Sequence, residues 1–289
     1  MRRTGAAAAV TVAALSVTVV GCTSAATEVR SAEASVVVSH VHAVDLDQRT
    51  GDVYVATHAG VLHVTADGSV ERLGDWAGDV MGMARLGDTI YFSGHPALDE
   101  NLPANIGVYQ LDLVGEGFAP ISLVGEVDFH SMTIKESPGG SALAGIDSAT
   151  GQVMVSRDGA ESWMAGSSIG ARSLSWDTTA EALYATTEQG LLVSRDDGMT
   201  FALVEGAPLL VLIASSPENA STDAFFVGVD VDGYVHTSTD GVTWASIGLA
   251  PPLTDALSVG GDGAIVSAGI SGVSRSDDRG ATWDVIAEF

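Results

Sequence analysis

The stretch Ser276-Asp277-Asp278-Arg279-Gly280-Ala281-Thr282-Trp283 lies close to the end of the chain and has three counterparts upstream. Each combines a serine or threonine, an aspartate, a glycine and a final aromatic residue. The counterparts are residues 156–163, 194–201 and 237–244. The four aromatic residues are 38, 43 and 39 positions apart. A period of about 40 residues is typical of the four-stranded blades of a β-propeller.

Each repeated stretch has the composition of a tight turn between two strands. The aspartate accepts backbone N–H groups, the glycine adopts a conformation closed to other residues, and the aromatic packs between sheets. The glycine comes one place early at Gly159, Thr239 stands where an aspartate is expected, and Phe201 replaces tryptophan. The residues that we assign to these structural turns are Ser156, Asp158, Trp163, Ser194, Asp196, Gly198, Phe201, Asp240, Gly241, Trp244, Ser276, Asp278, Gly280 and Trp283.

Four short strands are predicted around each turn, which gives an all-β fold. In the fourth unit these strands are 171–176, 182–187, 190–194 and 201–204, and in the first unit 41–46, 52–57, 60–65 and 69–73. The other units span 79–124, 126–168, 208–249 and 253–289. We therefore predict one domain, residues 36–289, folded as a β-propeller of six blades with four antiparallel strands each. Residues 35–39 leave open a closing strand or part of a seventh blade.

The pattern Ser-x-Asp-x-Gly-x-Thr-Trp resembles the Asp-box, or BNR repeat, of sialidase-like propellers. Residues 36–289 also resemble a family of exported bacterial propellers commonly labelled glycosyl-hydrolase-like. The segments that carry this second likeness are His40-Val41-His42, Tyr54-Val55-Ala56-Thr57-His58, Ser93-Gly94-His95-Pro96, Asp128-Phe129-His130 and Thr186-Thr187-Glu188-Gln189-Gly190-Leu191-Leu192. The resemblance implies a fold rather than a reaction, because Asp-boxes are not catalytic.

The N-terminus has the pattern of a secretory signal: a basic start, an uncharged apolar run and then Gly21-Cys22. Val19-Val20-Gly21-Cys22 resembles the bacterial lipobox, which implies cleavage after residue 21 and lipidation of Cys22, the only cysteine. Residues 22–35 would then form a flexible tether. We expect an extracytoplasmic protein held to the cell membrane by the lipid on Cys22.

The chain is strongly acidic, with 37 acidic and 12 basic residues. Residues 1–21 hold two of those basic residues and no acid, so cleavage would take the formal charge from −25 to −27. Such a surface repels phosphate backbones and anionic lipids. We therefore expect no nucleic-acid partner, and we expect a monomer.

Five of the seven histidines are predicted to gather at one end of the central channel. Strands of a blade alternate in direction. The turns between second and third strands therefore lie on the same face of the propeller as the links between blades. The five are His40, His42, His58, His95 and His130. Neutral imidazole is a common ligand of zinc, copper and nickel, which makes a metal site our hypothesis for this rim. The alternative is that each histidine is an ordinary polar residue at a channel mouth.

Two further features lie near these histidines. Met81, Met83 and Met132 fall on inner strands, where thioether ligands would favour copper over zinc, and apolar filling of the blades is the alternative. The connection between His95 and Gly107 is about ten residues longer than its counterpart in the first unit. It is predicted to overhang the histidine face, either as a cap over a site or as a neutral insertion.

No motif identifies an enzyme. The resemblance to sialidases lacks their arginine triad, so we expect no sialidase activity. Another glycosidase would need two carboxylates roughly 5 to 10 Å apart. Candidates near the channel mouth are Asp45, Asp128, Asp147, Glu188 and Asp230.

The leading hypothesis is a lipid-anchored propeller that binds a metal ion or a partner protein on the histidine face without catalysis. The alternative is a hydrolase of extracellular glycans that uses carboxylates at the channel mouth. A third hypothesis is a scaffold in which the histidines are incidental.

Overall fold

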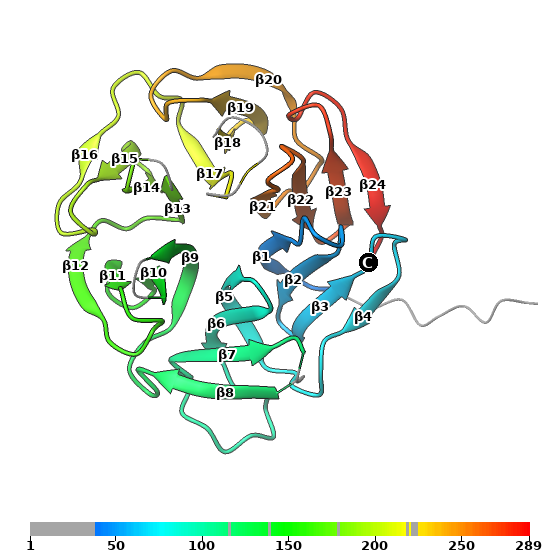
Figure 1. The fold of residues 1–289 in the computed structure, drawn as a ribbon, viewed down its shortest axis with the longest axis vertical. Coiled ribbons are helices and arrows are strands. Elements are labelled where there is room, and N and C mark those ends of the chain that lie inside the picture. Colours follow the sequence, from blue (N-terminus) through cyan, green and yellow to red (C-terminus); the bar gives the residue numbers. More distant parts are fainter. Residues whose placement is uncertain (1–37, 115–116, 138–139, 178–179, 218–219, 221–224) are drawn as a thin grey trace, which may run out of the picture. The chain divides into compact units, whose positions relative to one another are not determined.

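The computed structural model describes residues 38–289 apart from 115–116, 138–139, 178–179, 218–219 and 221–224. In this part the chain forms six four-stranded antiparallel sheets arranged as the blades of a β-propeller (Figure 1). The described residues contain no helix, and hence none that could cross a membrane. The predicted signal, Cys22 and the tether up to residue 35 lie outside the described residues.

Each blade consists of four strands that are consecutive in the sequence, and its first strand lies nearest the centre (Figure 1). Blade one contains β1 (Val41–Leu46), β2 (Val53–Thr57), β3 (Gly60–Val64) and β4 (Val70–Arg72). Blade two contains β5 (Asp79–Leu86), β6 (Thr89–His95), β7 (Val108–Asp112) and β8 (Gly117–Ser122). Blade three contains β9 (Phe129–Ser137), β10 (Gly140–Asp147), β11 (Gln152–Ser156) and β12 (Met164–Ser168).

The second half of the chain repeats this plan. Blade four contains β13 (Ser173–Asp177), β14 (Ala182–Thr187), β15 (Gly190–Ser194) and β16 (Ala202–Leu203). Blade five contains β17 (Leu210–Ser215), β18 (Phe226–Asp230), β19 (Tyr234–Ser238) and β20 (Ala245–Leu249). Blade six contains β21 (Ala256–Val259), β22 (Ile265–Gly269), β23 (Gly272–Ser276) and β24 (Asp284–Ala287). The prediction of six blades of four strands is confirmed.

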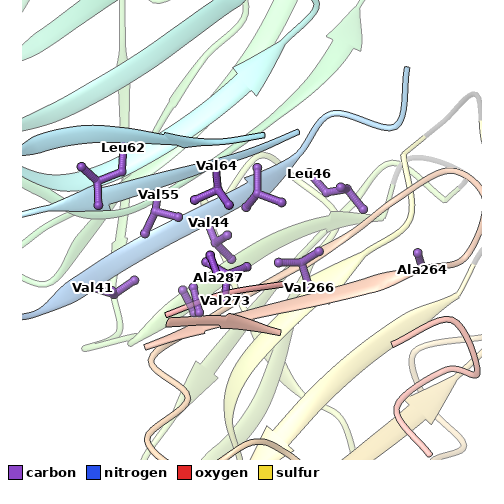
Figure 2. Close-up of a cluster of buried hydrophobic side chains, with 13 residues drawn as sticks. Val41, Val44, Leu46, Val55, Leu62, Val64, Ala264, Val266, Val273 and Ala287 are labelled. Atoms are coloured by element: carbon purple, nitrogen blue, oxygen red, sulfur yellow. The ribbon is translucent and has the colours of Figure 1, made fainter. Parts of the chain in front are cut away.

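The ring closes by packing between blade six and blade one. Every strand in the described part of the chain pairs within its own sequential blade, so none of these strands is exchanged across the closure. Val41 and Val55 of blade one share a buried cluster with Val266, Val273 and Ala287 of blade six (Figure 2). Of the segment predicted as an extra strand, Val38 packs against this cluster and Ser39 lies in a bend, whereas residues 35–37 lie outside the described part. Among the described residues, hydrophobic burial rather than an exchanged strand therefore closes the ring.

The turns between third and fourth strands share one hydrogen-bond pattern. In blade four the Ser194 hydroxyl donates to Asp196 at 2.8 Å and accepts the backbone N–H of Gly198 at 2.9 Å. Asp196 in turn accepts the backbone N–H and the hydroxyl of Thr200. Ser276 and Asp278 make the same bonds in blade six, and Ser156 and Asp158 make them in blade three. The aspartate therefore has the predicted turn-forming role.

The turns of blades five and three depart from the pattern of blades four and six. In blade five Asp240, and not Thr239, accepts the turn N–H groups, and it pairs with Ser238 in a turn one residue shorter. Placing Thr239 at the aspartate position was therefore wrong. In blade three Ala160 takes the place filled by glycine elsewhere, with a φ of 71°, and its N–H bonds to Ser156 at 2.9 Å. The alignment missed the blade-five case because it allowed no change in turn length, whereas the early glycine of blade three, Gly159, was noted from the sequence.

The aromatic residue at the end of each turn packs toward the preceding blade. Trp163 packs against Phe129 with ring centroids 4.9 Å apart and the rings tilted by 47°, in a cluster that includes Val108 of blade two. Glycine is required at Gly241, which has a φ of 70° and where a Cβ would lie 2.4 Å from the Tyr184 hydroxyl of blade four. These turns thus join neighbouring blades as well as the strands of one blade.

We expect Ser194→Ala to lower the free energy of unfolding by about 1–3 kcal/mol, because it leaves the buried N–H of Gly198 without an acceptor. Urea unfolding followed by tryptophan fluorescence measures the change. Ser274→Ala is the matched control, since Ser274 is also buried and its hydroxyl has no hydrogen bond within the described residues. Equal stabilities of the two variants would contradict a structural role for the turn serine.

Candidate metal centre

The register between the first two strands places one equivalent residue of each blade at the channel mouth. Equivalent pairs are Ala43↔Ala56, Gly82↔Ser93, Ser131↔Ile146, Ser173↔Thr186, Leu212↔Val229 and Ala256↔Ala268. The residues directly before the first member of each pair form what we call the mouth ring: His42, Met81, His130, Arg172, Val211 and Asp255. In blades one, two, three and five this residue is the extra one of a β-bulge, a feature that redirects a side chain.

Blades one to three add two more equivalent residues each at this rim. Two places before the mouth ring the inner strands carry His40, Asp79 and Asp128. Opposite these, at the end of the second strand, lie His58, His95 and Ser148. The pairing Asp79↔His95 and the bond from the Ser148 N–H to the Asp128 carbonyl at 2.9 Å establish this correspondence. Nine side chains of one rim therefore come from three positions repeated in three consecutive blades.

The first group of potential metal ligands is His40, His42 and His58, all from blade one. One ring nitrogen of each lies within 4.8 Å of the others. The rings of His40 and His42 are 4.6 Å apart and those of His42 and His58 are 4.7 Å apart. Asp79 of blade two lies beside this group, with Oδ2 2.9 Å from Nδ1 of His58 and Oδ1 3.5 Å from Nε2 of His42. This arrangement leaves Nε2 of His58 free to bind a ligand.

The second group is His95, Asp128 and His130, and its ligand atoms also lie within 4.8 Å of one another. Oδ2 of Asp128 is 2.6 Å from Nε2 of His130 and 3.4 Å from Nε2 of His95. The Ser148 hydroxyl donates to the same oxygen at 3.0 Å. The side chain of Asp128 is only 5% exposed, and its other oxygen is buried without a hydrogen bond.

The long connection after β6 supports the second group from outside. Nδ1 of His95 lies 2.8 Å from the carbonyl oxygen of Ala104, which can only accept a hydrogen bond. Nδ1 therefore donates a hydrogen bond to this carbonyl, and Nε2 faces Asp128. Glu100 fixes the loop by accepting from the indole of Trp76 and the N–H of Ala97, both at 2.9 Å. The loop thus lies at the histidine face, as predicted.

The carboxylates at both groups, Asp79 beside the first and Asp128 in the second, are ionised more readily than usual. Burial alone would raise the pKa of Asp79, but His42, His58 and His95 outweigh it and hold this pKa below its ordinary value. Burial likewise opposes ionisation of Asp128, and its contacts with His130, Ser148 and His95 lower its pKa overall. The hydrogen bond to Asp128 raises the pKa of His130 above the ordinary 6.5.

A cavity of about 350 Å³ opens beside the two groups at the centre of the propeller. All six inner strands line it, and His40, His42 and His130 reach its wall. The three methionines noted in the sequence also line it, with Met83 and Met132 buried and Met81 half-buried in the mouth ring. Three of the six candidate ligands therefore face this cavity at the end of the channel.

The structure brings all five predicted histidines together. His63 and His236 lie elsewhere, as expected. His63, in β3, stacks on Tyr54, and Nε2 of His236, in β19, lies 2.7 Å from Oδ2 of Asp230. Asp79 is a site residue that was not predicted from the sequence. Superposing the second unit on the third would have found it, because Asp79 and Asp128 occupy equivalent positions.

Only Asp128 among the five proposed channel-mouth carboxylates lies in the histidine cluster. Asp45 lies toward the far end of β1 and bonds to Arg85 at 2.6 Å, so its placement at the histidine mouth was wrong. Asp147 bonds to the hydroxyl of Thr150 within its own turn, although its charge still helps to raise the pKa of His130. Glu188 is exposed in the turn between β14 and β15, and Asp230 is engaged by His236. No pair of these acids flanks the cavity in the part of the chain that the structure describes. Asp255, which does line it, was not foreseen.

These residues are suited to divalent transition-metal ions. Imidazole and carboxylate ligands bind zinc and copper, and three protein ligands leave a coordination position open. Asp79 and the Ala104 carbonyl are placed to orient His58 and His95, as outer partners of metal-bound histidines commonly do.

A scan of protein-family models finds no family that matches this chain, and a search of curated proteins finds no match. Similar solved structures include a chain of a nidogen–laminin complex, with a TM-score of 0.60 and 12% identity over 80% of this chain and 90% of that one. A GH74 xyloglucanase from Xanthomonas campestris has a TM-score of 0.52 and 18% identity over 85% of this chain. YCF48 bound to a D1 peptide has a TM-score of 0.52 and 14% identity over 87% of this chain and 83% of that one.

At these identities the likeness shows the β-propeller fold and nothing finer. This chain covers 45% of the xyloglucanase chain, so it spans less than half of that enzyme's length.

In the metal-free protein we expect His130 to titrate with a pKa above 6.5 and Asp128→Asn to lower that pKa, because the variant removes the carboxylate charge. The His130–Asp128 ion pair stabilises the fold between the lowered pKa of Asp128 and the raised pKa of His130. Its contribution is lost as pH falls through the first or rises through the second. Histidine ring resonances followed by NMR against pH provide the measurement. An unchanged His130 titration in Asp128→Asn would refute the pairing.

Proposed function

We propose that this chain is an exported, lipid-anchored β-propeller that binds divalent transition-metal ions, zinc or copper, at the histidine-bearing mouth of its channel. One ion is held by His40, His42 and His58, and a second by His95, Asp128 and His130. The observation that carries the proposal is the convergence of three equivalent positions from three blades into two three-ligand groups.

Burial supports a bound cation at this rim. Nε2 of His42, Oδ1 of Asp79 and Oδ1 of Asp128 are all buried without a hydrogen bond among the described residues. A buried polar atom left unsatisfied costs about 1–3 kcal/mol. Divalent ions would offset that cost, because they bind the lone pairs of the ligand atoms and neutralise the two carboxylates.

Export and anchoring rest on the N-terminal sequence alone. The basic start, the apolar run and the lipobox-like residues before Cys22 support them. The turns between third and fourth strands have the hydrogen bonds expected of Asp-boxes, which supports that assignment. The separation of the acids Asp45, Asp147 and Asp230 from the cavity favours metal binding over glycan hydrolysis.

We expect residues 31–289, purified without an affinity tag, to retain up to two zinc or copper ions per chain after dialysis. The double variant His42→Ala, His130→Ala removes one ligand from each group and should retain far less metal. Plasma mass spectrometry of the dialysed proteins measures the content.

The matched control is the double variant His63→Ala, His236→Ala, which removes two histidines outside the site and should keep the metal of the unchanged protein. Absence of retained metal, together with no tight uptake when zinc and copper are added back, would overturn the proposal. Equal loss in both double variants would show unfolding rather than loss of ligands, and circular dichroism would detect it.

Asp79→Asn should weaken metal binding at the first group by about 10- to 100-fold, the usual effect of losing a carboxylate that orients a ligating histidine. The second group should be affected less, because Asp79 contacts His42 and His58 directly. Competition titrations with a chromophoric chelator give both affinities. An unchanged affinity of the first group would exclude the orienting role of Asp79.

A further inference from the structure

Arg172 occupies the blade-four position of the mouth ring, equivalent to His42, Met81 and His130. Its backbone N–H donates to Thr186 at 2.9 Å, and its side chain lines the central cavity. It is the only lysine or arginine among the described residues that line this cavity. Within the described part of the chain its guanidinium has no hydrogen bond or ion pair. The register therefore places an unpaired cation one blade away from His130.

We propose that the channel mouth binds a small organic oxyanion, a carboxylate or a phosphate, between Arg172 and the metal ion of the second group. The inference rests on the proposed function, because the metal supplies half of the site. A guanidinium binds either headgroup through two parallel N–H donors. The oxyanion would therefore pair with the guanidinium of Arg172 and occupy the open coordination position of the metal ion.

The second group leaves room for this ligand. His95, Asp128 and His130 supply three donors, and zinc commonly takes a fourth from water or a substrate when its site is not purely structural. His130 reaches the cavity wall, so the open position is accessible from the cavity rather than from the loop above His95.

Charge also favours an anion at this mouth. With both groups filled, two divalent ions and Arg172 outweigh the nearby carboxylates Asp79, Asp128 and Asp255. Asp255 directly precedes β21 of blade six, and blade five separates that blade from blade four, which carries Arg172 (Figure 1). The chain as a whole carries a formal charge of −25 and repels anions, so anion binding is favoured only where positive charge is gathered, as at this mouth.

The cavity walls add a preference for an apolar body on the ligand. Below the mouth the walls are formed by Met83, Met132, Leu174, Leu212 and Leu257. A volume of about 350 Å³ lies within the range of small-molecule sites. An organic anion can therefore place its headgroup at the rim and its apolar part inside the channel.

The test is calorimetric titration of metal-loaded residues 31–289, which contain the whole propeller, with acetate, benzoate, inorganic phosphate and phenyl phosphate. We expect saturable binding, tighter for benzoate than for acetate and for phenyl phosphate than for phosphate. Arg172→Ala should weaken this binding about 10- to 100-fold while the metal content stays unchanged. Tighter binding of benzoate would identify a carboxylate headgroup, and tighter binding of phenyl phosphate a phosphate headgroup. Either result supports an oxyanion site.

Arg195→Ala is the matched control, because Arg195 is an exposed arginine in the turn between β15 and β16, and it should leave binding unaltered. Equal affinity of the unchanged protein and Arg172→Ala would overturn the inference, as would binding to the metal-free protein at the same strength. Absence of binding by all four anions to protein with full metal content would overturn the inference alone. Absence of metal would overturn the proposed function and this inference together.

Discussion

The ladder between the first and second strands of each blade determines where every side chain of the channel points. Successive residues of a strand face opposite sides, so a slip of one residue would exchange His42 for Val41 at the channel mouth. In blades one, two, three and five the ladder contains one extra residue at the same place. Because the bulge recurs at equivalent positions, the mouth ring forms one level of side chains, although its members are far apart in the sequence.

The outer turns help to hold that register. Each turn serine satisfies a buried backbone N–H, and each terminal aromatic packs on the blade before it. Hydrophobic clusters between neighbouring blades, such as that of Val41 and Val266, bury the rest of the apolar surface. The turns and clusters lie away from the histidines. The protein therefore separates the interactions that stabilise the fold from the residues of the candidate site.

The repeat predicted most of the fold because its turn residues have a local physical role. A period of about 40 residues and alternating strand directions were enough to give six blades and to place five histidines on one face. Turn length could not be predicted in the same way, since Asp240 replaces Thr239 only when one residue is dropped. The pairing of the two strands that flank the turn, rather than the local sequence, determines whether the turn is one residue shorter.

Carboxylates were harder to predict than histidines. With 37 acids and seven histidines in the chain, an acid near a strand end carries little information by itself. Asp45 lies on the same strand as His42 yet bonds to Arg85 toward the other end of the channel. Asp79 lacks a histidine on its own strand and was overlooked, although its register matches that of Asp128. A strand-by-strand superposition is therefore needed to identify the acids, because their position along the strand determines which face they reach.

The distribution of the ligands around the ring also bears on function. Blades one to three provide all the histidines of the cluster, whereas blades four to six provide Arg172, Val211 and Asp255 at the same level. Ligands from all six blades would enclose an ion on the axis and exclude other molecules. Ligands from one half of the ring would instead hold metal against one wall and leave the rest of the ring, which carries Arg172 next to blade three, open to the cavity. This asymmetry favours a centre that binds a further molecule over a metal site that serves only to stabilise the fold.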